Sequence, residues 1–236
     1  MSTLQDNESY ISYPNVEEFS KSKHKSVTRF VIAGVGSSDL GAAALARNVA
    51  DFYHEPVATI VAGYGIKDLL GESIDGWFSL GQSNEDSYQK EKHHSSNTSD
   101  DDIDFVAGNP DSNTMLKLLI NENINIKLIL GHSKGCLSLS NALFGMFDSA
   151  KSSLITKRIK NMQVVTTGAV INLPDELDLT YQFLGSYDWL GKLNSRNGLA
   201  FTPIEGCWHH TNTTFPLSMD IKAVLRQLTS ENEVVS

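Results

Sequence analysis

The hydrophobic positions of the chain form short apolar runs separated by stretches with helical periodicity. The apolar runs are rich in β-branched residues and lie at 29–33, 56–62, 126–130, 162–167, 181–185 and 199–204. The helical stretches lie at about 39–50, 115–120, 133–147 and 217–228. Continuous apolar runs of this length are typical of strands buried on both faces. The alternation predicts an α/β fold, with a doubly wound, mostly parallel sheet of about six strands and helices on both faces.

The polar stretches set the expected domain organisation. Residues 1–27 predict a polar N-terminal segment, and residues 28–230 predict one domain. Within that domain the pattern is interrupted at about 71–113. Its central part, 82–104, holds almost nothing apolar, which predicts a polar surface insertion.

Charge and composition exclude several partners. The net charge of −9 disfavours nucleic acid and anionic membranes as partners. No apolar stretch reaches the roughly 20 residues of a membrane-spanning helix, and the N-terminus lacks the pattern of a secretory signal. Two cysteines, Cys136 and Cys207, do not make a disulfide framework. We therefore expect reduced thiols, no membrane span and a cytoplasmic location.

The pentapeptide Gly131-His-Ser-Lys-Gly135 stands between a predicted strand and a predicted helix. This context fits a nucleophile elbow, in which a strained turn lifts the serine clear of the sheet. Ser133 is then the candidate nucleophile, and the amide of Lys134 supplies half of an oxyanion hole. The alternative is a glycine-rich turn with a solvent-facing serine, because so short a pattern often arises by chance.

A serine nucleophile needs a base and a carboxylate that orients it. After an elbow of this type the acid comes next along the chain and the histidine last. Downstream of Ser133 the only histidines are His209 and His210, and Asp188 follows a predicted strand. His132 is expected to be a packing residue. A solvated turn holds the alternative acids, which are Asp175, Glu176 and Asp178.

On these motifs, residues 28–228 resemble a compact, lipase- or esterase-like member of the α/β-hydrolase family. The resemblance implies that Ser133 is the nucleophile, Asp188 the acid in a Gly-x-x-Asp turn, and His209 the base, three residues after Gly206. His210 stays open as the alternative base.

The resemblance also extends to the first strand, where Ala33-Gly34 resembles the family's His-Gly loop with alanine in place of histidine. It implies that Val35 gives the second oxyanion amide, or Gly36 if the register shifts by one residue. The family usually inserts a lid between about residues 169 and 181, where only about a dozen residues are present here. We therefore expect an α/β-hydrolase fold with no conventional cap.

Other motifs are weaker. The pair Gly34-x-Gly36 lacks the third glycine of a dinucleotide fingerprint, since Asp39 takes its place. The polar residues His93, His94 and 100–102 lack metal-ligand spacing and are typical of a charged loop. We expect no cofactor and no metal. Aromatic residues that could line an apolar pocket are Trp77, Phe78, Trp189 and Trp208.

The sequence thus predicts a serine hydrolase that cleaves an ester or related acyl bond in a small-molecule or acyl substrate. Two alternatives stay open: an acyltransferase that uses the same three residues, and a binding protein that keeps the fold without the chemistry. Substrate identity and oligomeric state are left undetermined.

Overall fold

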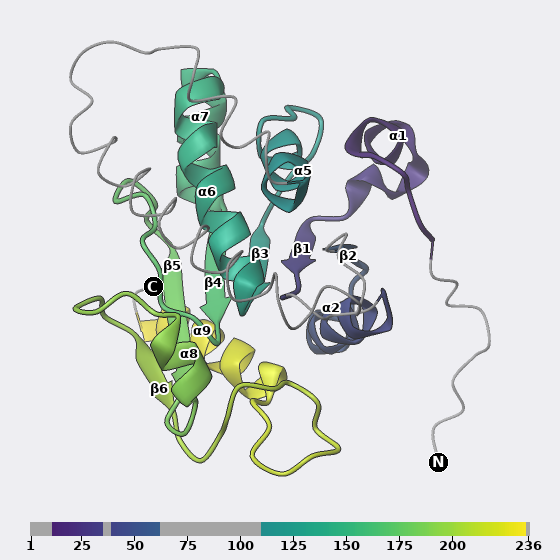
Figure 1. The fold of residues 1–236 in the computed structure, drawn as a ribbon. Helices are drawn as coiled ribbons and strands as arrows, with labels where there is room; N and C mark the ends of the chain where they lie inside the picture. Colours follow the sequence, from purple (N-terminus) through teal and green to yellow (C-terminus); the bar gives the residue numbers. More distant parts are fainter. Residues whose placement is uncertain (1–10, 35–38, 62–109, 235–236) are drawn as a thin grey trace.

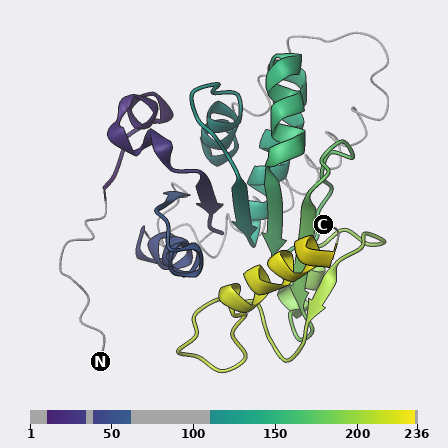
Figure 2. The same ribbon diagram turned by 180° about the vertical axis from the view of Figure 1, so that it is seen from behind.

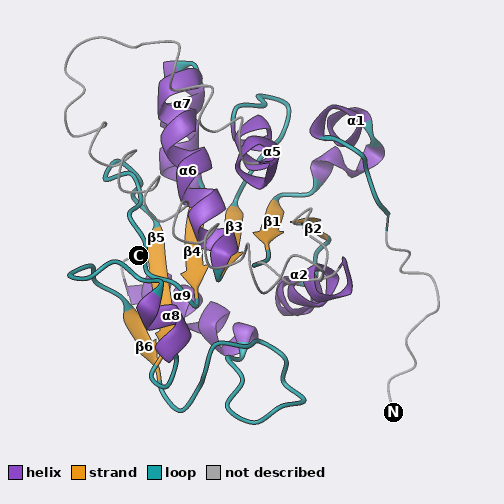
Figure 3. Ribbon diagram, viewed as in Figure 1, coloured by secondary structure: helices purple, strands orange, loops and turns teal. Residues whose placement is uncertain are grey.

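A computed structural model describes residues 11–34, 39–61 and 110–234 of the chain. The described strands form one parallel sheet in the order β2-β1-β3-β4-β5-β6 (Figures 1 and 3). The strands are β1 (Arg29–Ile32), β2 (Val57–Ile60), β3 (Leu128–His132), β4 (Gln163–Thr167), β5 (Thr180–Gly185) and β6 (Thr202–Ile204). The predicted doubly wound α/β sheet is confirmed.

Helices cover both faces of this sheet. The described helices are α1 (Val16–Lys21), α2 (Asp39–Tyr53), α5 (Pro110–Leu119), α6 (Lys134–Ser149), α7 (Ser152–Asn161), α8 (Trp189–Leu193) and α9 (Ile221–Val234). Helices α1, α5 and α6 pack into one apolar core, whereas α2 and α9 pack into a second core. Figure 2 shows α9 lying across the face opposite to α6. No helix in the described part of the chain has the length and apolar character needed to cross a membrane.

The inner strands β1, β3 and β4 supply buried apolar residues to both cores. In β1, Phe30 and Ile32 belong to the core under α5 and α6, while Val31 belongs to the core under α2 and α9. Successive side chains of a strand point to opposite faces, which requires apolar residues at every position when both faces are covered.

Element boundaries differ from the sequence prediction in several places. Strand β3 begins two residues later than expected, at Leu128, and extends through His132 because that residue pairs with Thr167 of β4. Helix α7 was not predicted. The predicted polar N-terminal segment contains α1, whose residues Val16 and Phe19 are buried in the core. Of the predicted insertion, only its last residues, 110–113, are described, and they form the first turn of α5.

The strand order places a topological switch point between β1 and β3. From β1 the chain passes through α2 to β2 on one side, while β3 to β6 extend the sheet on the other side. In open parallel sheets, ligands bind outside the carboxyl ends of the strands at this point. Gly34 follows β1 and Ser133 follows β3, so the predicted nucleophile stands at the switch point.

Candidate active site

Ser133 occupies a strained turn between β3 and α6. Its backbone has φ 55° and ψ −129°, a conformation that non-glycine residues rarely adopt. The turn is held from both sides, because the Ser133 amide donates to Thr167 O at 2.9 Å and Ser133 O accepts from the Cys136 amide at 2.9 Å. Strain of this kind persists only where the surroundings fix it, and it is common at functional sites.

Two glycines make the turn possible through close packing. A Cβ atom on Gly135 would lie 2.3 Å from Ile32 O, so α6 can approach β1 only with glycine at this position. A Cβ atom on Gly34 would lie 2.7 Å from Ser133 Cβ. The ends of β1 and β3 therefore meet at Ser133 with no side chain between them.

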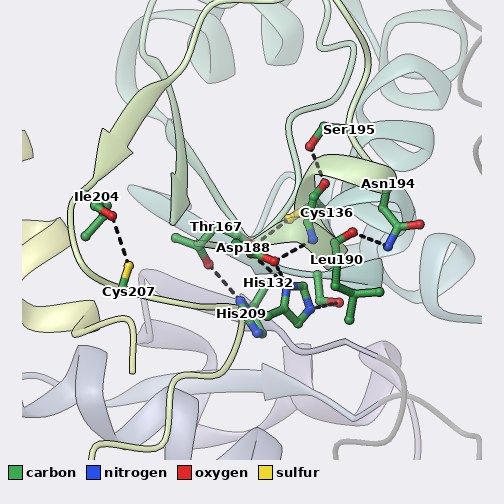
Figure 4. A network of polar contacts seen from close by, with 12 residues as sticks. His132, Cys136, Thr167, Asp188, Leu190, Asn194, Ser195, Ile204, Cys207 and His209 are labelled. Carbon is green, nitrogen blue, oxygen red and sulfur yellow. Dashed lines mark hydrogen bonds and ion pairs between the residues drawn. The ribbon is translucent and has the colours of Figure 1, made fainter. Parts of the chain in front are cut away.

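His209 is hydrogen-bonded to Ser133. It lies in the loop after β6, and its Nε2 is 2.9 Å from Ser133 Oγ. Its other ring nitrogen, Nδ1, is 2.9 Å from Asp188 Oδ2 and 3.1 Å from Oδ1 (Figure 4). A carboxylate accepts only, so Nδ1 carries the proton and Nε2 accepts from the Ser133 hydroxyl.

Asp188 is fully buried and is fixed by its own helix. It is the N-cap of α8, and its Oδ1 accepts a hydrogen bond from the Gly191 amide at 2.6 Å. The turn that carries Asp188 is also tied to the loop of His209, since the Tyr187 amide donates to Cys207 O at 3.1 Å. The turn of Asp188 and the loop of His209 are therefore linked by a backbone hydrogen bond that does not involve Ser133.

The alternative base and the alternative acids lie elsewhere. His210 Nε2 donates to Pro216 O at 3.2 Å, and its ring packs edge-to-face on Trp208 and Phe215. Three exposed carboxylates precede β5, at the sheet edge opposite to the one that carries Ser133. These are Asp175, Glu176 and Asp178. Thus Ser133, Asp188 and His209 are the predicted residues that come together.

The predicted oxyanion donors are described only in part. Lys134 is the first residue of the 16-residue helix α6, whose N-terminal end favours negative charge. Its side chain is buried, and burial lowers the pKa of its ammonium group, whereas the carboxylate of Asp111 opposes this shift. Val35 and Gly36 lie outside the described residues, so the second donor stays a prediction.

Neither cysteine has the character of a nucleophile. Burial raises the pKa of the Cys136 thiol to about 12, and its Sγ donates to Thr167 O. Burial, followed by the carboxylates of Asp188 and Glu205, also raises the pKa of Cys207. A reactive cysteine needs the opposite shift. Ser133 therefore remains the candidate nucleophile.

Two of the four predicted pocket aromatics are described in the structure, Trp189 and Trp208. Trp189 is 61% exposed at the start of α8, while Trp208 is partly buried against His210. Trp77 and Phe78 lie outside the described residues, as do His93 and His94. The described residues contain no group of three side chains suited to hold a metal ion.

Thr167 and Gly168 were not predicted from the sequence as site residues, and His132 was expected only to be a packing residue. Thr167 ends β4 beside the end of β3, and Gly168 follows it with φ 71°. The rule that ligand sites gather at the carboxyl ends of parallel strands was the available signal. It requires knowing that β4 is the neighbour of β3, which the chain alone does not state.

Comparison with known proteins adds no relative to this picture. No protein-family model, curated protein or solved structure matches the chain.

Proposed function

We propose that this chain is a serine hydrolase of the α/β-hydrolase type, which cleaves an ester or related acyl bond. One observation carries the proposal: His209 joins the hydroxyl of Ser133 at 2.9 Å to the buried carboxylate of Asp188 at 2.9 Å. The three residues follow the carboxyl ends of three parallel strands, in the chain order Ser, Asp, His.

The reaction follows from this arrangement. Ser133 Oγ attacks the carbonyl carbon while its proton passes to His209 Nε2, and Asp188 stabilises the imidazolium that forms. The tetrahedral oxyanion develops at the N-terminus of α6, where the Lys134 amide is one expected donor and Val35 the other. Each such donor is worth about 3 kcal/mol in the transition state. The leaving group takes the proton from His209, and the acyl group remains on Ser133.

Water completes the cycle. His209 removes a proton from a water molecule, whose oxygen attacks the acyl carbon. As the bond from the acyl carbon to Ser133 Oγ breaks, His209 returns the proton to Oγ and the acid is released. Every proton in both half-reactions is accounted for by His209. The residues of this site therefore need no redox group for the chemistry proposed.

Labelling with a fluorophosphonate tests the proposal, because this probe reacts with base-activated serines whatever their substrate. We expect wild type to be labelled, and Ser133→Ala and His209→Ala to be unlabelled while folded. His210→Ala is the matched control and should be labelled like wild type, since its ring bonds Pro216 and not Ser133. A folded wild type that does not react would overturn the proposal and favour a binding protein. Equal labelling of Ser133→Ala would place the nucleophile elsewhere.

A further inference from the structure

A second histidine lies directly beside the proposed base. The ring centroids of His132 and His209 are 5.2 Å apart, with an interplanar angle of 38°. Figure 4 shows both rings within one polar network that includes Thr167 and Asp188. The acyl-transfer steps described above do not use His132.

The hydrogen bonds of Thr167 fix the protonation of this second ring. Thr167 Oγ1 donates to Gly131 O at 3.1 Å, which uses its only proton. It can therefore only accept from His132 Nδ1, which lies 3.2 Å away. The proton of neutral His132 is thus on Nδ1, and the ring is tethered to the end of β4.

Both imidazole rings lie against the backbone of Gly168, which has no side chain. Gly168 follows Thr167, and a Cβ atom there would lie 3.1 Å from Cε1 of both His132 and His209. A side chain at position 168 would therefore require both rings to shift by a few tenths of an ångström. The positive φ of 71° also favours glycine at this position.

His132 remains neutral beside the group that must become charged. Burial, then the neighbouring His209, lowers the pKa of His132 to about 3, with His210 acting in the same direction. Asp188 acts in the opposite direction but does not prevail. When His209 takes the proton of Ser133, it therefore meets a neutral ring and not a second cation.

The two histidines are also supported by different kinds of structure. His209 stands on the loop between β6 and α9, whereas His132 and Thr167 are paired at the ends of the buried strands β3 and β4. Functional groups on strands are positioned more accurately than those on loops. A base on a loop gains most from a contact with the sheet.

We propose that His132 is a positioning residue for the base, an inference that rests on the function proposed above. Its neutral ring is tethered to Thr167 and packs against His209 beside Gly168. This contact keeps the His209 imidazole aligned between Asp188 and Ser133. His132 transfers no proton in this role.

The test measures the second-order rate of fluorophosphonate labelling, per folded molecule, across pH. His132→Ala removes both the ring and the tether, and we expect a loss of up to about 100-fold, as for misplacement of a reacting group by about 1 Å. His132→Asn keeps a donor for Thr167 but lacks the ring, so it should resemble His132→Ala. His132→Phe keeps a ring and should label at a rate closer to wild type than to His132→Ala.

A spectroscopic measurement gives the second readout. In NMR of the protein with 15N-labelled histidine, His132 should stay in the Nδ1–H form without titrating between about pH 5 and 9.

His54→Asn is the matched control for the fluorophosphonate labelling, because His54 is exposed and its left-handed backbone suits asparagine.

The outcomes separate this inference from the proposed function. A labelled wild type with His132→Ala and His132→Phe at the wild-type rate would overturn the positioning role alone. Recovery in His132→Asn but not in His132→Phe would do the same, as would an Nε2–H tautomer of His132. A folded wild type that is not labelled at all would overturn the proposed function, and the positioning role with it.

Discussion

At the scale of single residues, the site depends on hydrogen bonds that are made independently of one another. Asp188 caps α8 through Gly191 and at the same time accepts from His209 Nδ1. Its position is therefore set by the backbone of α8 and does not depend on its contact with His209. A substitution can therefore remove the charge of Asp188 without moving its side chain.

Asp188→Asn uses this separation. The amide oxygen can still accept from Gly191, so we expect the protein to fold with a melting temperature near that of wild type. The amide nitrogen faces His209 Nδ1 and donates, which forces the proton of His209 onto Nε2, where it can no longer accept from Ser133. The labelling rate should fall by about 10⁴-fold. A rate within a few-fold of wild type would show that Asp188 does not orient the base.

The residues around the base show what the sequence could and could not predict at this scale. Chain order, turn residues and the family resemblance favoured Ser133, Asp188 and His209, with His210 left open as the alternative base. The contacts of His132 and Thr167 depend on the register of β3 against β4, which pairs these two residues. No short motif encodes that register, because it is decided by packing between strands 35 residues apart along the chain.

At the scale of elements, the elbow depends on how closely α6 approaches β1. The approach leaves no room for a Cβ atom on Gly135, which would lie 2.3 Å from Ile32 O. The obstacle is backbone of the buried inner strand β1, so it cannot move aside as a flexible side chain would.

Gly135→Ala should therefore displace the start of α6. We expect the free energy of unfolding to fall by about 1–3 kcal/mol, the usual cost of overpacking. The labelling rate per folded molecule should fall as well, because Ser133 is the residue just before this helix. Ser149→Ala, at the exposed far end of α6, is the matched control for denaturant titration and labelling. Equal stability of the Gly135→Ala variant and wild type would contradict the packing described here.

Strands with both faces buried were predictable from the sequence, whereas the mostly polar helix α7 was not. The apolar runs of β1 and β3 predicted strands because all but one residue of each strand is buried. Helix α7 was missed because it buries only Leu154 and Arg158. The Arg158 guanidinium donates to Leu119 O and Asn121 O at the end of α5. Because this buried residue of α7 is an arginine and not an apolar residue, its position gives no apolar signal in the sequence.

At the scale of the whole molecule, the strand order brings the three parts of the site to one edge of the sheet. Ser133, Asp188 and His209 follow β3, β5 and β6, whose parallel strands all end at this edge. Burying a titratable group at this edge lowers the free energy of unfolding at any pH where that group would be charged in water. His132 is such a group, and its cost depends on pH.

Stability should therefore fall as the pH is lowered through the window set by His132. Unfolded histidine binds a proton below about pH 6.5, whereas folded His132 does so only near pH 3. Between these values the unfolded state binds more protons, so the free energy of unfolding decreases as the pH falls, by at most about 1.4 kcal/mol per pH unit. Denaturant titrations of wild type and His132→Phe from pH 7 to 4 should show a shallower decline in the variant. Parallel curves would mean that His132 is protonated normally in the folded protein.

The most direct test of the central claim is to locate the fluorophosphonate adduct in the chain. Trypsin releases Leu128–Lys134 as one peptide, because Lys127 precedes it, and Ser133 is the only residue in it that bears a hydroxyl. Mass spectrometry of labelled wild type should find the adduct on this peptide, with none on it after reaction of Ser133→Ala. An adduct on any other peptide of wild type, with Leu128–Lys134 unmodified, would contradict the assignment of Ser133 as the nucleophile.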